Sequence, residues 1–237
     1  MGEIFFDGVA NRAGLLVGKI DPDRVGKDRV IEAKLAARDE TIPFDQRPAP
    51  LACSIQIKTI LTTTKSIKLS LSVAERLAQT TQPTFICIIR MTEEGDALEM
   101  RLVHLLDRPL AKILKRLREE FVKGTTDLNS KSITFNLKDG QKVGGAPRDL
   151  YRALADEIGP DMDDYAAKKT QQKKTLGYVA GQRTSIQATV TTDNLSDLVD
   201  GLLGLRPLPL TVFEVADQRF GIKIPISDLN ALTGLRQ

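Results

Sequence analysis

The chain has 237 residues, of which 41% are hydrophobic and 27% charged, and its formal net charge at pH 7 is only +3. This composition excludes a disordered or collagen-like chain, because it is close to that of ordinary globular proteins. No apolar run approaches the roughly 20 residues that a membrane helix needs, so the sequence predicts no membrane-spanning helix.

The first part of the chain predicts the order helix, strand, loop and strand. We expect a short helix within residues 3–17, a strand over 29–35 and a loop with three prolines over 38–50. Polar and apolar side chains then alternate over residues 52–60, which predicts a strand. One face of that strand is apolar, and its polar face carries Ser54, Gln56 and Lys58.

A second helix and a pair of strands follow. Ser72 and Glu75 have the spacing of a capping box, which predicts the start of a helix of about two turns. Residues 84–91 favour a buried strand, and residues 98–104 favour a further strand after a turn. Helix 109–122 has one apolar stripe, and its basic residues lie largely off that stripe.

The second half predicts shorter and more polar elements. We expect strand 131–137, helix 147–158, a polar linker near 160–175, strand 184–191, helix 193–203 and two strands around 209–224. The complete order predicts an α/β fold with a mixed central sheet flanked by helices, followed by an α+β C-terminal region. We therefore divide the chain into a core, residues 1–122, and an accessory or partner-binding region, residues 123–237, with a boundary in the linker as the alternative.

The cysteines and the single histidine offer no structural zinc site. Cys53 and Cys87 each lie in a strongly apolar stretch, so we expect buried thiols rather than a disulfide. His104 ends a predicted strand without a second histidine or a cysteine cluster, and we expect a structural role for it. Glu3 and Asp7 stand where a signal peptide would carry basic residues, so the cytoplasm is the expected compartment.

One set of polar residues has the chemistry of a metal centre. Asp28 begins one predicted strand, and Gln56 and Lys58 lie on the polar face of the next. Neighbouring strands are about 4.8 Å apart, so these side chains can reach one ion. A carboxylate, an amide oxygen and the Ile57 carbonyl are hard ligands suited to Mg²⁺ or Mn²⁺. Lys58 would then orient or deprotonate water, or neutralise charge in the transition state.

Two further acids accompany this set. Glu3 lies on the first predicted helix and is a candidate direct or supporting ligand. Glu32 follows Asp28 by four residues and therefore lies on the same strand face. The alternative interpretation is that these polar residues at strand edges are simply solvated, because such a pattern also arises by chance.

The arrangement resembles the PD-(D/E)xK nuclease superfamily, and within it the Mrr-like effector nucleases. The motifs that carry the resemblance are Glu3 in Met1-Gly2-Glu3, Gly26-Lys27-Asp28, Glu32 and Gln56-Ile57-Lys58-Thr59. The resemblance covers roughly residues 1–122 and implies a restriction-endonuclease-like core that hydrolyses phosphodiester bonds with Mg²⁺ or Mn²⁺. It also implies an effector role in prokaryotic antiviral defence. Gln56 departs from the commoner second carboxylate, which lowers the negative charge offered to a metal.

Basic residues gather in two places. Within residues 101–150, 11 Lys and Arg residues stand against 6 Asp and Glu residues. A local basic surface on a nearly neutral protein suits a polyanion, and we expect the phosphate backbone to be held there. The candidate nucleic-acid-binding residues are Lys112, Lys115, Arg116 and Arg118 of the predicted helix, with Lys168, Lys169, Lys173 and Lys174 of the linker. The alternative is a solvated helix face and a lysine-rich linker.

The leading hypothesis is a metal-dependent nuclease that cleaves DNA, and RNA as a further substrate. A catalytically silent nucleic-acid-binding or assembly module on the same fold is the alternative, and a plain interaction protein is a third. The chain is also similar to the nuclease part of the DREN-type subunits that partner short prokaryotic Argonautes. That similarity implies a guide-loaded partner, while self-association into a homo-oligomer is the other expected assembly.

Overall fold

The computed structural model describes residues 1–20, 27–33, 41–47, 49–207 and 210–226. Its contacts divide the chain into two compact units, Met1–Leu176 and Gly177–Gln237. The expected division after residue 122 does not coincide with this one. Residues 123–176 belong to the first unit because β8 (Gln141–Val143) pairs with β6 (Ala97–His104) in the central sheet.

The first unit contains the following helices and strands. Its helices are α1 (Gly2–Arg12), η1 (Phe44–Gln46), α2 (Leu71–Gln79), α3 (Asp107–Val122), η2 (Leu137–Asp139), α4 (Asp149–Ile158) and α5 (Met162–Thr175). Its further strands are β1 (Leu15–Lys19), β2 (Arg29–Ala33), β3 (Ala52–Leu61), β4 (Ser66–Ser70), β5 (Thr84–Met91) and β7 (Ser132–Asn136). The order confirms the predicted α/β class.

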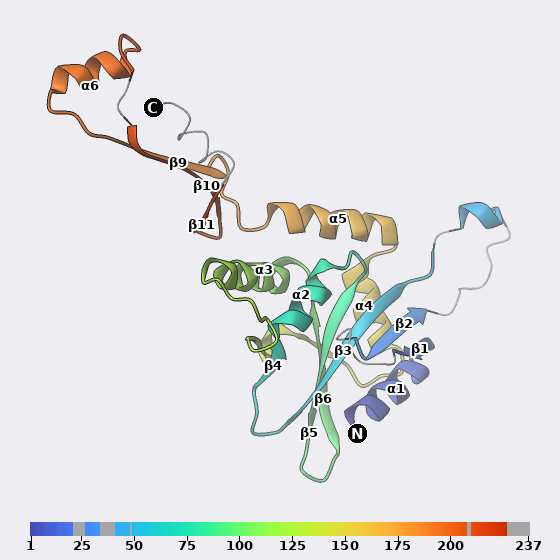
Figure 1. Ribbon diagram of the computed structural model, residues 1–237. Coiled ribbons are helices and arrows are strands. Elements are labelled where there is room, and N and C mark those ends of the chain that lie inside the picture. Colours follow the sequence, from blue (N-terminus) through green and yellow to red (C-terminus); the bar gives the residue numbers. More distant parts are fainter. Residues whose placement is uncertain (21–26, 34–40, 48, 208–209, 227–237) are drawn as a thin grey trace. The chain divides into compact units, whose positions relative to one another are not determined.

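The central sheet is mixed and has six strands in the order β1-β2-β3-β5-β6-β8 (Figure 1). Strands β3 and β5 run parallel, and the other neighbouring pairs are antiparallel. Strand β5 lies in the middle and is buried along almost its whole length. This explains its nearly continuous apolar sequence, which is typical of a strand covered on both faces.

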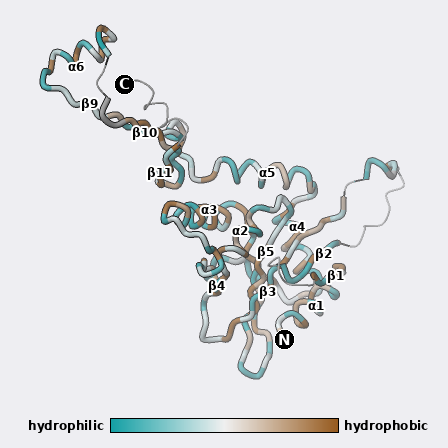
Figure 2. Tube along the Cα trace, in the orientation of Figure 1, coloured by the Kyte–Doolittle hydropathy of each residue, from teal (hydrophilic) through white to brown (hydrophobic). Residues whose placement is uncertain are grey.

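Hydrophobic clusters cover both faces of the sheet. One cluster joins the apolar side of β3, including Ile55, to Phe6 of α1 and Leu154 of α4. The other joins Ile86 and Ile88 of β5 to α2, α3 and the small sheet of β4 and β7. Figure 2 shows the hydrophobic residues concentrated along the central strands. Alternation in β3 therefore directs Ile55 and Ile57 to the α1 side, as the sequence predicts.

The structure also differs from several of the expected elements. The predicted helix within residues 3–17 ends at Arg12, and β1 follows after Gly14, whose φ of 81° favours glycine. Helix α2 starts at Leu71 because Ser70, rather than Ser72, accepts the capping hydrogen bond from the Val73 amide. The polar linker near 160–175 is helix α5, which Asp161 caps at its N-terminus.

The second unit is a three-stranded antiparallel sheet with one helix. Its elements are β9 (Thr184–Val190), α6 (Leu195–Leu202), β10 (Leu210–Arg219) and β11 (Ile222–Pro225), and its strand order is β11-β10-β9. Apolar side chains of α6 are exposed, among them Leu195 and Leu202. Across the described parts of both units, no helix is long and apolar enough to cross a membrane.

Candidate functional site

The structure brings Asp28 directly against the predicted Gln56–Lys58 segment. Asp28 Oδ2 accepts a hydrogen bond of 2.7 Å from Gln56 Nε2. The same oxygen accepts a hydrogen bond of 2.6 Å from the backbone amide of Ile57. Asp28 therefore meets both residues although they lie far apart in the sequence, but it meets their nitrogen donors and not the Gln56 and Ile57 oxygens that were expected to face an ion.

Strand pairing explains why these residues meet. Arg29 of β2 is the partner of Ile55 in β3, and the antiparallel register then places Asp28 opposite Gln56. A backbone hydrogen bond of 3.0 Å from the Asp28 amide to the Ile55 carbonyl extends the pairing beyond β2. Lys58 follows Gln56 by two residues and leaves the same face of β3, roughly 7 Å further along the strand.

The centre of the site is nearly closed to solvent. Asp28 is 8% exposed and Gln56 is 3% exposed, which contradicts, for these two residues, the alternative interpretation that they are simply solvated. Lys58 is half-buried and is the most accessible of the three side chains.

The expected donor set has the chemistry of a ligand set for a hard divalent cation, although in the structure its carboxylate already accepts hydrogen bonds from two nitrogen donors. It contains one carboxylate, the Gln56 amide and the neighbouring Ile57 carbonyl. In the structure the amide nitrogen of Gln56 faces Asp28, and half a turn of the amide would present its oxygen instead. The described residues form no group of three or more His, Cys, Asp or Glu side chains that could hold a metal. Mg²⁺ or Mn²⁺ would therefore be held by a single negative charge, with water completing its coordination.

Glu3 has a different partner from the one expected. Its carboxylate lies 2.9 Å from Arg29 Nη2, and Asp7 holds the same guanidinium through both carboxylate oxygens, at 2.8 and 3.0 Å. Arg29 is 5% exposed, and the hydrogen bond that it donates to Asp7 is the main cause that raises its pKa. Because Arg29 also donates to the Asp28 carbonyl, Glu3 reaches the site only through the arginine. This cluster was not predicted from the sequence, although the spacing of Glu3 and Asp7 by one helical turn indicates a shared partner.

The remaining motif residues do not join the centre. Glu32 is exposed and pairs in register with Ala52, four residues along the strands from the Asp28–Gln56 pair. That separation corresponds to roughly 14 Å. Gly26, the first residue of the predicted Gly26-Lys27-Asp28 motif, lies outside the described residues.

Two lysines of α5 bind the C-terminal end of α2. Lys169 is fully buried, and its Nζ donates to the carbonyl oxygens of Gln82 at 3.1 Å and Leu77 at 3.5 Å. Lys173 donates to the Gln79 carbonyl at 2.7 Å. Burial is the main cause that lowers the pKa of Lys169 to about 7, and the positive charges of Lys173 and Lys27 contribute to the same shift. Of the predicted lysine cluster, Lys168 and Lys174 are exposed, whereas Lys169 is inaccessible to nucleic acid.

The predicted cations of α3 differ in their surroundings. Lys112 and Lys115 are exposed. Arg116 forms ion pairs with Glu119 at 3.4 Å and with Glu120 at 3.0 Å. Arg118 is half-buried and already has an interaction partner.

His104 is held by contacts on both ring nitrogens. Nδ1 lies 2.9 Å from a Glu157 carboxylate oxygen, and Nε2 lies 2.7 Å from the Tyr165 hydroxyl. The ring also stacks on Phe85. Burial is the main cause that lowers the pKa of His104. These contacts agree with the expected structural role.

Both cysteines are buried and free, as expected. Burial raises the pKa of the Cys53 thiol to about 12, and it also raises the pKa of Cys87. Neither thiol is therefore a nucleophile at neutral pH. In comparisons with protein-family models, curated proteins and solved structures, no match to this chain was found.

Proposed function

We propose that the chain is a metal-dependent nuclease whose site is formed by Asp28, Gln56 and Lys58. The observation that carries this proposal is the meeting of Asp28 Oδ2 with the Gln56 side chain and the Ile57 backbone at 2.7 and 2.6 Å. A carboxylate, an amide and a lysine on two adjacent strands are suited to binding a hard cation beside a phosphodiester. DNA is the proposed substrate, with RNA as a further one.

Each residue has a separate role in this proposal. Asp28 supplies the negative charge that holds Mg²⁺ or Mn²⁺, and the Gln56 and Ile57 oxygens add neutral ligands. The bound cation would supply charge stabilisation to the phosphoryl group. Lys58, the accessible member, would place an ammonium group beside the phosphate and stabilise the charge that develops there. The Arg29 side chain holds Asp28 in position by donating a hydrogen bond to the Asp28 backbone carbonyl.

Metal binding tests the proposed role of Asp28. Titration calorimetry with Mn²⁺ should detect binding to the wild-type chain and clearly weaker binding to Asp28→Asn. Glu32→Gln is the matched control, because it removes an exposed carboxylate from the same strand face. Equal Mn²⁺ affinity in the wild type and in Asp28→Asn would show that Asp28 is not a ligand.

A catalytically silent nucleic-acid-binding module is the second candidate. The burial of Asp28 and the hydrogen bonds that already engage its carboxylate favour this alternative. A gel-shift assay run beside a nicking assay separates the two candidates. A silent module would retard DNA in Mn²⁺ without cutting it, whereas the proposed nuclease would nick supercoiled plasmid.

The proposed context is an assembly. A site with one charged ligand loses its cation easily when the strands shift, so we expect weak activity from the isolated chain. Self-association or a guide-loaded Argonaute-type partner would then activate it in antiviral defence. Specific activity measured against protein concentration, with mass from light scattering, tests this expectation. Full activity in a monomeric sample without a partner would contradict it.

A further inference from the structure

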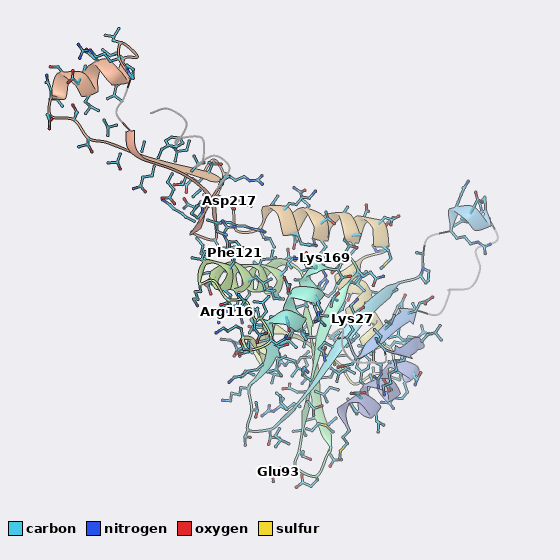
Figure 3. All side chains as sticks on the ribbon, in the orientation of Figure 1. Lys27, Glu93, Arg116, Phe121, Lys169 and Asp217 are labelled. Carbon is cyan, nitrogen blue, oxygen red and sulfur yellow. The ribbon has the colours of Figure 1, made fainter. Side chains whose placement is uncertain are left out.

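A basic groove lies between α3 and β7. It consists of two cavities of about 300 and 360 Å³ that share Lys112. Five basic side chains line it: Arg108, Lys112, Lys115, Arg116 and Lys138. Figure 3 shows Arg116 on α3, which forms one wall of this groove.

The groove keeps an excess of positive charge. Its two acidic residues are already matched, since Asp139 lies 3.6 Å from Lys112 and Glu119 lies 3.4 Å from Arg116. Arg108, Lys115 and Lys138 are exposed. Within the described part of the chain, none of these three has an ion-pair partner. An anion that enters the groove could therefore pair with these three cations without displacing a carboxylate from any of them.

The two walls present their polar groups with similar spacing. On α3, Arg108, Lys112 and Arg116 follow one another every four residues, which is about 6 Å of helix rise. On β7, Ser132, Thr134 and Asn136 alternate with buried residues, so they share one face at intervals of about 6.8 Å. Both periods are comparable with the separation of successive phosphates along a nucleic-acid strand.

Lys112 fixes the two walls against each other. Its Nζ donates a hydrogen bond of 2.6 Å to the Thr134 carbonyl and lies 5.0 Å from the centre of the Phe135 ring. Lys68 extends the charged face, because it is exposed and pairs in register with Thr134 across the β4–β7 sheet. The Phe135 ring itself is fully buried and offers no platform on which a base could stack.

We infer that this groove binds the sugar–phosphate backbone of one nucleic-acid strand without reading its bases. The inference rests on the proposed function for the choice of nucleic acid as the polyanion. Hydroxyl and amide donors opposite a row of cations are the groups that proteins use for phosphate contacts. An acidic peptide is less suited, because the regular spacing of both walls matches a chain that carries one charge in every repeat.

Binding without cleavage tests the groove. Fluorescence anisotropy with a labelled single strand of mixed sequence, in EDTA, compares the wild type with the triple variant Arg108→Ala, Lys115→Ala, Lys138→Ala. The matched control is Lys142→Ala, Arg148→Ala, Arg152→Ala, which removes three exposed charges outside the groove. The groove variant should bind about tenfold more weakly or worse, and its salt slope should fall by about 2 units, because each contact on a single strand contributes about 0.7. The control should keep the wild-type slope, and all three proteins should bind strands of different sequence alike.

Three results would overturn the inference. One is wild-type binding by the groove variant, and another is an equal loss in the control, which would reflect net charge alone. The third is tighter, groove-dependent binding of a polyglutamate peptide, which would indicate an acidic protein partner. A parallel nicking assay with Lys58→Ala separates this inference from the proposed function. Lys58-dependent nicking with groove-independent binding would refute only the groove, and groove-dependent binding without nicking would refute only the nuclease.

Discussion

The Asp28 carboxylate satisfies two buried donors, the Gln56 amide and the Ile57 backbone N–H. Asp28→Ala should therefore lower the free energy of unfolding by about 2 kcal/mol, because both donors would lose their acceptor in a closed site. Asp28→Asn keeps one acceptor oxygen, and we expect it to cost about half as much. Urea unfolding measures both values. An Asp28→Ala variant as stable as the wild type would show that the site is hydrated.

Lys169 makes stability depend on pH in a defined direction. Its pKa is about 7 in the folded chain, against an ordinary value of 10.5. Between these values the unfolded chain holds one more proton on this amine than the folded chain does. Unfolding then takes up a proton, so this lysine makes the free energy of unfolding rise with pH above about 7.

Comparison of two lysine variants isolates this effect. Lys169→Met should flatten the rise in stability between pH 7 and 8.5, whereas the exposed Lys168→Met should leave it unchanged. The window stops at 8.5 because the buried thiols, whose pKa values are raised, oppose the rise once unfolded cysteines ionise. Urea midpoints at several pH values provide the measurement. If the rise in stability with pH persists in Lys169→Met, another titrating group causes it.

At the scale of elements, Arg29 connects α1 to β2 through Glu3 and Asp7. Arg29→Ala should destabilise the chain by about 2–3 kcal/mol, since it breaks a buried ionic cluster. Glu3→Ala should cost less than about 1 kcal/mol, because the Glu3 side chain is 49% exposed and its attraction is screened by water. Double-mutant cycles should give Asp7 the larger coupling to Arg29, and a larger coupling for Glu3 would contradict the bidentate geometry.

Long periodic elements could be predicted from the sequence, and short ones could not. Strands β3 and β5 and helix α3 have strong apolar patterns, and the structure places them within a residue or two of the predicted bounds. Strands β4 and β8 were missed because they are short and are stabilised by pairing with distant strands. Helix α5 was missed because its stripe is not apolar: its buried residues are Tyr165 and Lys169, which no hydrophobic periodicity reveals.

The candidate site was predictable only in part, for a similar reason. The meeting of Asp28 with Gln56 follows from side-chain alternation along a strand and from the pairing of two successive strands, and both could be predicted from the sequence. The ion pair between Glu3 and Arg29 depends on how α1 packs, and the burial of Lys169 depends on where α2 ends. Both are tertiary effects that local patterns do not contain.

At the scale of the whole molecule, the two units differ in their buried cores. Nearly all the buried apolar side chains of the described residues lie in Met1–Leu176, whereas Gly177–Gln237 contributes Val215 and Ala216. Limited proteolysis should therefore remove the second unit while the central sheet survives, because local opening is easiest where few apolar contacts are buried. Mass spectrometry of the fragments checks this order. Survival of β9 and β10 for as long as β5 would contradict it.

Asp28, Gln56 and Lys58 are proposed to form one metal-dependent hydrolytic site. The most direct measurement is the single-turnover nicking rate of supercoiled plasmid in Mn²⁺, in Mg²⁺ and in EDTA. We expect metal-dependent nicking that falls by about 100-fold or more in Lys58→Ala, while the exposed Lys65→Ala keeps the wild-type rate. Nicking at the wild-type rate in Lys58→Ala, or in EDTA, would show that these three residues do not form such a site.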